Sequence, residues 1–326
     1  MTDASLYGQR SVFVTGASGI VGSWLVRRLL SDGASVVALH RDEDPRSEFM
    51  RSGDHLRVTR VHGALEDLPL LERALVQYEV DVVFHLGAQT QVRHAHLQPL
   101  ATLDSNVRGT YNLLEAVRRL ARPVEAVVVA SSDKAYGAST ELPYTEGHPL
   151  AGRSIYEASK SAADLITSAY ATSYSLPVGI ARCANIYGGG DLNWDRIVPG
   201  TIRSLIQGNR PVVRSDGTPK RDYLYVDDAV TGYLAIGEAL MEGRQHGEAF
   251  NFGSGVPVAV LDLVDEIGRA VGRTDLTPLI KSDARHEIEA QWLDATKART
   301  ILGWAPSFGL STGLDRTVAW YREVLA

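Results

Sequence analysis

The fold of this chain is decided by residues 11–22, Ser11-Val12-Phe13-Val14-Thr15-Gly16-Ala17-Ser18-Gly19-Ile20-Val21-Gly22. The apolar start of this stretch predicts a short buried strand. After the glycine-rich turn, an amphipathic helix is expected as far as Leu30. A glycine-rich turn between a strand and a helix brings backbone N–H groups and the positive helix end against a pyrophosphate. A second strand is expected over 34–39. The motif therefore predicts the first βαβ unit of a dinucleotide-binding fold.

Strands and helices alternate through the first half of the sequence. Strands are predicted at 56–61, 81–86, 126–130 and 177–181, and helices at 68–78, 106–120 and 156–174. This alternation indicates an α/β protein with a doubly wound parallel sheet of the Rossmann type, whose ligands bind beyond the carboxyl ends of the strands.

After Arg182 the regular alternation breaks up, which predicts a smaller α/β lobe for the substrate, interleaved in sequence with the first domain. We expect the dinucleotide-binding domain to comprise residues 1–183 and 224–250, and the substrate lobe 184–223 and 251–326. Asp227 is expected to cap a helix that runs from Asp228 to Leu240.

Composition excludes several classes of partner. The 326 residues carry a net charge of −6 with a pI near 5.9, and no basic run indicates nucleic-acid binding. No stretch of 18 apolar residues predicts a membrane span, and the first ten residues hold no long apolar segment typical of a secretory signal. The single cysteine, Cys183, excludes an internal disulfide and is expected to be a buried filler. Together these features predict a cytoplasmic protein.

The second informative stretch starts at the predicted strand 126–130 and continues into Ser131-Ser132-Asp133-Lys134. Tyr156 and Lys160 follow on the next predicted helix, one turn apart, so that they share a face. A cation near a phenol favours the phenolate, so we expect Lys160 to lower the pKa of Tyr156. A tyrosine tuned in this way takes a proton from a sugar hydroxyl near neutral pH.

With the glycine motif and Tyr156-x-x-x-Lys160, the chain resembles the extended short-chain dehydrogenase/reductases over nearly its whole length. The stretches Asn185-Ile186-Tyr187-Gly188 and 221–228 resemble those of the nucleotide-sugar enzymes in this family. The resemblance implies tightly bound NAD(P) and a nucleotide-sugar substrate. It makes Lys160 the ribose-binding lysine, Tyr156 the base for oxidation at C4, and Ser132 the hydrogen-bonding partner of Tyr156.

The same resemblance implies two sets of contact residues. Cofactor contacts are expected from Gly16, Ser18, Gly19, Ile20, Gly22, Arg41, Leu65, Leu86, Ala88, Tyr156 and Lys160. Substrate contacts are expected from Gln89, Arg93, Asn185, Arg196, Arg221 and Arg285, with Asn185, Arg196 and Arg221 facing the diphosphate. Arg41 follows His40 where an acidic residue would hold a ribose 2′-hydroxyl, so NAD and NADP both stay open.

Asp133 favours a 4,6-dehydratase, a lyase, because the loss of water from C6 needs an acid for the departing oxygen. Related dehydratases place a glutamate next, whereas the Asp133-Lys134 pair resembles CDP-glucose 4,6-dehydratases and favours a CDP-glucose-like substrate. The residue that takes the C5 proton stays open, since Lys134 serves either as a desolvated neutral amine or as a cofactor contact. The catalytic set is thus Ser132, Asp133, Lys134, Tyr156 and Lys160.

Two other functions compete with the dehydratase. A nucleotide-sugar 4-epimerase shares the first oxidation but returns hydride to the other face of C4. A non-catalytic dinucleotide-sensing protein is less favoured, because it has no need to keep Ser132, Tyr156 and Lys160 together.

Two expectations concern metal binding and assembly. His94 and His96 lack further ligands at metal spacing, so no metal site is predicted. A homodimer is expected through the helices 106–120 and 156–174, as in many extended family members. Apolar side chains that extend beyond one narrow stripe of these helices support this expectation, namely Leu113, Leu114, Ile166 and Tyr170.

Overall fold

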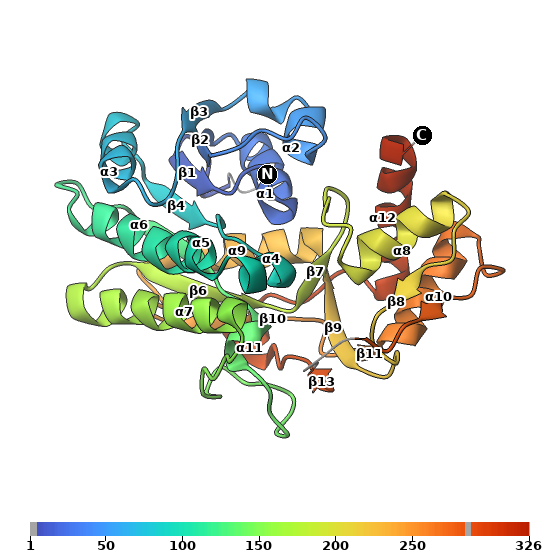
Figure 1. Ribbon diagram of the computed structural model, residues 1–326. Helices are drawn as coiled ribbons and strands as arrows, with labels where there is room; N and C mark the ends of the chain where they lie inside the picture. The colour runs from blue at the N-terminus through green and yellow to red at the C-terminus, as the bar shows by residue number, and fades with distance from the viewer. Residues whose placement is uncertain (1–4, 284–287, 326) are drawn as a thin grey trace.

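The computed structural model describes residues 5–283 and 288–325 (Figure 1). Arg285, one of the predicted substrate contacts, lies outside the described residues. The described chain forms a large parallel sheet covered by helices on both faces, with a smaller group of strands and helices at one end (Figure 1). The predicted α/β class is confirmed.

Seven strands form the large sheet in the order β10-β6-β5-β4-β1-β2-β3, and all neighbours are parallel. The strands are β1 (Ser11–Thr15), β2 (Ser35–His40), β3 (Thr59–His62), β4 (Val82–His85), β5 (Ala126–Ala130), β6 (Val178–Cys183) and β10 (Ala249–Phe252). Apolar residues fill both faces of these strands, because helices cover each side. The carboxyl ends of β1, β4 and β5 therefore meet at one edge of the sheet.

Helices pack on the two faces of this sheet in separate groups. One core cluster joins α1 and α9 to the sheet, and the other joins α3, α6 and α7 to its opposite face. The helices are α1 (Ile20–Ser31), α2 (Glu48–Arg51), α3 (Leu68–Gln77), α4 (Val92–Leu97), α5 (Pro99–Leu103), α6 (Gly109–Arg118), α7 (Ile155–Tyr174), α9 (Val226–Met241) and α11 (Thr296–Leu302). Short turns of other helical types occur at Asp54–Leu56 (η1), Asp104–Arg108 (η2) and Asp133–Tyr136 (η3).

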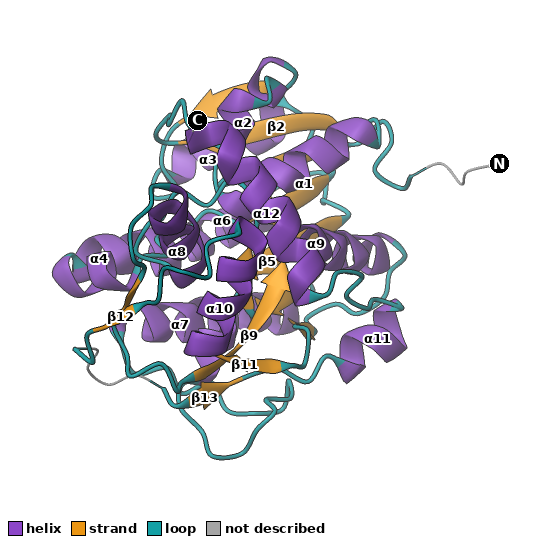
Figure 2. Ribbon diagram, turned by 90° about the vertical axis from the view of Figure 1, so that its right-hand side faces the viewer, coloured by secondary structure: helices purple, strands orange, loops and turns teal. Residues whose placement is uncertain are grey.

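The smaller group contains a sheet in which β9 pairs with β7, β11 and β13, and a two-stranded pair of β8 and β12. Figure 2 labels β9, β11, β12 and β13. Its elements are β7 (Asn185–Tyr187), α8 (Ile197–Ile206), β8 (Val212–Val213), β9 (Lys220–Tyr225), β11 (Pro257–Ala259), α10 (Val260–Val271), β12 (Leu279–Ile280), β13 (Ala290–Gln291) and α12 (Leu310–Leu325). A third core cluster holds α8, α10 and α12 against β9. Between its segments the chain returns to the large sheet through α9 and β10, and the exact domain boundaries stay a prediction.

Two local predictions are wrong. The strand predicted from residue 56 begins at Thr59, because Asp54–Leu56 forms a 3₁₀ turn that leaves Leu56 exposed. Asp227 does not cap α9, which begins one residue earlier at Val226. The neighbouring Asp228 is instead buried, and its carboxylate accepts hydrogen bonds from the backbone N–H groups of Ser307 (2.7 Å) and Phe308 (3.1 Å).

None of the helices in residues 5–283 and 288–325 combines the length and the apolar character that a membrane span requires.

Candidate active site

The glycine-rich turn lies at the carboxyl end of β1 and leads directly into α1. Gly16 has φ +72°, and a Cβ there would lie 2.8 Å from the backbone N of Gly87, beyond β4. A Cβ on Gly22 would lie 2.0 Å from the Gly16 carbonyl oxygen, so only glycine lets the helix approach the turn this closely. Gly19 precedes α1 without a capping side chain, and Ser18 and Ile20 flank it. This cradle fits the pyrophosphate of a dinucleotide.

A buried row of hydrogen bonds, which the sequence reasoning missed, runs from this turn toward α7. The Gly87 N–H donates to Thr15 Oγ1 (2.9 Å), and Thr15 Oγ1 lies 2.9 Å from His85 Nδ1. The other ring nitrogen of His85 lies 3.0 Å from Thr110 Oγ1, whose hydroxyl donates to the Asn106 carbonyl. Burial and the nearby Lys160 lower the pKa of His85 to about 3, so the ring is neutral.

Asn106 completes this row next to α7. Its side chain accepts from the Gln89 N–H (2.7 Å) and donates to the Gln89 carbonyl (3.0 Å). It also donates to Ser159 Oγ (2.9 Å), and that hydroxyl donates to the Tyr156 carbonyl. Leu86 and Ala88, two predicted cofactor contacts, flank Gly87 in the segment that begins this row.

The predicted adenosine end of the cradle follows β2 and β3. Arg41 is exposed and its guanidinium donates to Asp42 (2.7 Å). Among the described residues, His40, Glu43 and His62 form the one group that could hold a metal ion, with ligand atoms within 4.8 Å of one another. The same Glu43 oxygen is bound by Arg60 (2.9 Å), so a cation already neutralises the carboxylate.

Leu65 lies deeper in the same region, buried between the loop after β3 and α6. Its carbonyl accepts a hydrogen bond from Asn112 on α6 (3.2 Å), and its side chain leaves no room for a Cβ on Gly109. Its role as a cofactor contact stays a prediction.

The catalytic turn, defined here as residues 132–134, follows β5 at the same edge of the sheet. The Ser132 hydroxyl donates to Asp133 Oδ1 (3.0 Å) and accepts from the Lys134 N–H (3.2 Å). Asp133 is almost fully buried, and Lys134 Nζ lies 3.4 Å from its Oδ2. A serine hydroxyl, a carboxyl group and an amine therefore converge within three residues.

Tyr156 and Lys160 come from the first turns of α7, which begins with a capping box between Ser154 and Glu157. The pKa of Tyr156 is raised above its ordinary value: burial is the largest cause, Asp133 adds to it, and Arg196 and a hydrogen bond with Ser132 oppose it. The prediction of a lowered pKa is therefore wrong, and the cation that opposes the rise is Arg196. Lys160 Nζ instead donates to the Ala130 carbonyl at the end of β5 (2.9 Å).

Lys160 is itself unusual, because burial lowers its pKa to about 8, against an opposing effect of Asp164. Asp164 is held by a bidentate ion pair in which Arg182 Nε and Nη2 each donate at 2.8 Å. The Ser131 hydroxyl donates to the same carboxylate (2.7 Å), so α7, β5 and β6 are fixed to one another directly behind the catalytic turn.

Lys134 is held from the other lobe. Its ammonium donates to Gln291 Oε1 in β13, and Gln291 Nε2 donates to the Asp133 carbonyl (2.9 Å). Burial lowers the pKa of Lys134, Asp133 opposes this effect, and Arg221 adds to it. Sequence reasoning missed Gln291, because no motif surrounds it and 157 residues separate it from Lys134.

Two predicted substrate arginines approach the same place from the smaller lobe. Arg196, at the start of α8, donates to Asp191 (3.0 Å) and to Thr90 Oγ1 in the loop after β4 (3.2 Å). Its charge acts on Tyr156, and the charge of Arg221 in β9 acts on Lys134. Both arginines therefore lie close to the catalytic side chains.

The remaining predicted substrate residues have less direct placements. The Gln89 side chain accepts from the Gln91 N–H (2.6 Å), and Arg93 is exposed on α4. Asn185 Nδ2 in β7 donates to the Asp222 carbonyl of β9 (3.1 Å). The substrate role of Arg93 stays a prediction.

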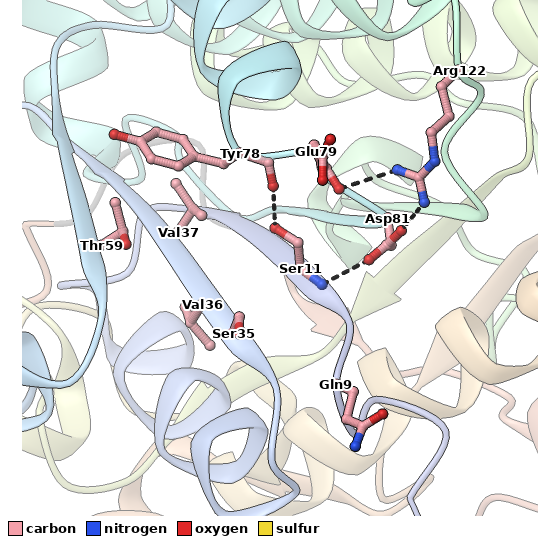
Figure 3. Close-up of a pocket in the computed structure, with 10 residues that line it drawn as sticks. All are labelled: Gln9, Ser11, Ser35, Val36, Val37, Thr59, Tyr78, Glu79, Asp81 and Arg122. Atoms are coloured by element: carbon pink, nitrogen blue, oxygen red, sulfur yellow. Dashed lines mark hydrogen bonds and ion pairs between the residues drawn. The ribbon is translucent and has the colours of Figure 1, made fainter.

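A hollow of about 350 Å³ lies at the opposite edge of the large sheet, where β1, β2 and β3 begin (Figure 3). Ser11 donates to the Tyr78 carbonyl (2.7 Å), and Arg122 donates to Asp81 and to the Glu79 carbonyl. The polar groups here bind one another, and the amino ends of parallel strands are not where such sheets bind ligands. This hollow is therefore separate from the candidate site.

Known proteins are similar to this chain over nearly its whole length. A family model described as GDP-mannose 4,6 dehydratase matches residues 13–317. A CDP-glucose 4,6-dehydratase of Salmonella typhimurium is 33% identical, over 99% of this chain and 93% of the relative. A UDP-glucose 4-epimerase of Mycolicibacterium smegmatis is 32% identical, over 95% of this chain and 98% of the relative.

Among solved structures, a dTDP-glucose 4,6-dehydratase of Streptomyces venezuelae with NAD bound superposes with a TM-score of 0.87. It is 30% identical and the match covers 96% of this chain and 97% of that one. Dehydratases and epimerases are thus about equally similar to this chain, so overall identity does not choose between the two reactions.

Proposed function

This chain belongs to the NAD-dependent nucleotide-sugar epimerases and dehydratases of the extended short-chain dehydrogenase/reductase family, and we propose that it is a nucleotide-hexose 4,6-dehydratase. One observation carries the choice: a buried carboxyl group, Asp133, hydrogen-bonded to the Ser132 hydroxyl beside Tyr156. An epimerase has no departing oxygen to protonate and gains nothing from an acid in this position. The product is an NDP-4-keto-6-deoxyhexose, and a CDP-glucose-like substrate is favoured.

The proposed chemistry divides among four side chains. Tyr156 takes the proton of the C4 hydroxyl, and its hydrogen bond with Ser132 and the charge of Arg196 oppose the rise in its pKa that burial causes. NAD(P), when bound, would supply the acceptor for the C4 hydride and the donor of the hydride to C6. The C4 ketone makes the C5 proton acidic. Asp133 delivers a proton to the C6 hydroxyl, which leaves as water.

We assign the C5 proton to Lys134. Its partial burial lowers its pKa, so a larger fraction is the neutral amine that can take a proton. The amine then returns the proton to C5 after the hydride reaches C6. At the end of the cycle Tyr156 holds one more proton than at the start, and Asp133 holds one fewer. Transfer of one proton from Tyr156 to Asp133 restores both groups.

Arg196 and Arg221 are proposed to hold the substrate diphosphate. They lie on different elements of the smaller lobe, α8 and β9, and their charges reach Tyr156 and Lys134 respectively. A guanidinium matches the oxygens of a phosphate with two parallel hydrogen bonds. Binding of the diphosphate between them would present the hexose to the catalytic turn.

The cofactor is proposed to be tightly bound, because it is regenerated in each cycle. Arg41 and Arg60 favour a 2′-phosphate at the adenosine ribose, whereas Glu43 beside them favours a 2′-hydroxyl. Mass spectrometry of the dinucleotide released on denaturation decides between NADP and NAD.

The runner-up is a nucleotide-sugar 4-epimerase, favoured by the 32% identity to the mycobacterial enzyme. The deciding experiment follows one hydrogen. A substrate carrying deuterium at C4 should give a 4-keto-6-deoxy sugar with deuterium on the C6 methyl, and reaction in D₂O should place deuterium at C5. A product with the label retained at C4 and an inverted hydroxyl would establish epimerisation instead. CDP-, dTDP-, GDP- and UDP-hexoses should be screened to identify the base.

We also propose a homodimer through the face formed by α4, α5, α6 and α7, but without two of the four residues that the sequence suggested. Leu113 and Leu114 are fully buried against the large sheet, and so are not available to a partner. The exposed large apolar side chains of these helices are Val92, Leu97, Leu100, Leu103, Tyr111, Ile155, Leu165 and Tyr174. A particle of 35 kDa by light scattering at micromolar concentration would contradict the dimer.

A further inference from the structure

Gln291 has a position that its sequence context does not explain. Its side chain is completely buried although it carries an amide, and it comes from β13 in the smaller lobe. Both ends of the amide bind the catalytic turn of the larger lobe: Oε1 accepts from Lys134 Nζ, and Nε2 donates to the Asp133 carbonyl at 2.9 Å. A buried amide satisfied by two neighbouring residues of a catalytic turn fixes their geometry.

Resting on the proposed function, we propose that Gln291 is the positioning residue of the catalytic turn. It directs the Lys134 side chain toward C5 of the hexose and ties the Asp133 backbone to the substrate lobe. Gln291 touches neither substrate nor cofactor in this assignment and acts through Lys134 and Asp133.

The neutrality of Gln291 matters for the acid–base behaviour of Lys134. The charged groups that act on Lys134 are Asp133 in its own turn, Arg221 from β9 and Glu157 from α7. An amide oxygen accepts a hydrogen bond from Lys134 without adding a negative charge. A carboxylate in the same place would stabilise the ammonium and raise the pKa of Lys134.

Gln291 also links Lys134 to the substrate arginine. In the parallel pairing of β13 with β9, Gln291 is the register partner of Arg221. A displacement of β9 when Arg221 binds a diphosphate would therefore be transmitted to the residue that holds Lys134.

The first experiment titrates Lys134 directly and needs no substrate. The chain has only five lysines, so ¹³C-labelled lysine side chains are resolvable by NMR, and Lys134→Arg assigns the signal. Gln291→Glu should raise the titration midpoint of Lys134 by about one pH unit or more, because a carboxylate lies against Nζ. Gln207→Glu, which adds the same charge at an exposed position, should leave the midpoint unchanged. An unchanged midpoint in Gln291→Glu would overturn the inference.

The second experiment separates the two halves of the reaction. Gln291→Met keeps the side-chain volume and removes both hydrogen bonds. The reduced nicotinamide formed in a single turnover should appear at the wild-type rate, whereas 4-keto-6-deoxy product should form about 10²-fold more slowly. Parallel losses of both steps would mean a general structural role and would overturn the inference.

The pH profile adds a readout that a structural role would not move. Gln291→Glu and Gln291→Met both lose the bond to the Asp133 carbonyl, so their difference isolates the added charge. The rising limb of the elimination rate should lie at higher pH in Gln291→Glu than in Gln291→Met. A wild-type protein that makes no 4-keto sugar would overturn the proposed function, while the NMR titration still decides whether Gln291 holds Lys134.

Discussion

The glycine-rich turn after β1 and the catalytic turn after β5 lie at the same edge of one parallel sheet, but they are held in different ways. The first is shaped by contacts between residues that are close in sequence, such as Gly16 and Gly22, and by Gly87 at the end of the adjacent strand. The second is held by Gln291, a residue of the other lobe. A dinucleotide cradle can thus be built within one βαβ unit, whereas this catalytic turn depends on how the two lobes meet.

The largest effect is expected for Tyr156→Phe, which acts at the catalytic turn and leaves the cradle intact. The variant cannot take the C4 hydroxyl proton. Turnover should therefore fall by about 10⁴-fold, the upper end of the range for the loss of one proton-transfer group. The dinucleotide should still copurify in the wild-type amount, as measured by absorbance after denaturation. A variant that loses the cofactor as well would show that the two turns are not separable.

Asp133→Asn divides the chemistry within the catalytic turn itself. The amide still accepts a hydrogen bond from Ser132 but has no proton to give to the C6 oxygen. Oxidation at C4 should continue while elimination falls by about 10²–10⁴-fold. Rapid-mixing absorbance of the reduced nicotinamide and chromatography of the sugar product measure the two steps. Full dehydration by this variant would remove the acid role from Asp133.

The same contrast explains what the sequence could predict. The fold followed from Gly16–Gly22 and from apolar runs such as Ala126–Ala130, because these patterns reflect local backbone needs and burial on both faces of a parallel sheet. The placement of Ser132 and Tyr156 on consecutive elements was also predictable.

The remainder could not be predicted, because it arises from contacts between distant segments. Arg196 supplies the charge that acts on Tyr156, and Gln291 holds Lys134, yet neither relation has a signature in spacing. The direction in which Lys160 points depends on the Ala130 carbonyl, which a helical spacing does not reveal.

Lys160 lies between the two turns and gives a pH-dependent test. Burial lowers its pKa to about 8, whereas an unfolded lysine titrates near 10.4. Between pH 8 and 10 the unfolded state therefore binds more protons than the folded state, and stability rises with pH through this window. Lys160→Met lacks this contribution. The unfolding free energy of the wild type minus that of Lys160→Met, measured with urea, should increase by about 2–3 kcal/mol from pH 8 to pH 10. A constant difference would mean that Lys160 keeps an ordinary pKa.

Gly22→Ala is the smallest change and tests the cradle alone. The new Cβ would lie 2.0 Å from the Gly16 carbonyl oxygen, a backbone atom that moves only if the turn and α1 separate. Overpacking of this kind costs about 1–3 kcal/mol of stability, and the widened turn should retain less dinucleotide. The matched control is Gly309→Ala, because a Cβ there meets nothing within 4 Å. Thermal unfolding and cofactor content should change only in the first variant, while added dinucleotide should restore its C4 oxidation. Loss of oxidation that saturating cofactor does not restore would show that the glycine-rich turn also shapes the catalytic turn, and the contrast between the two would fail.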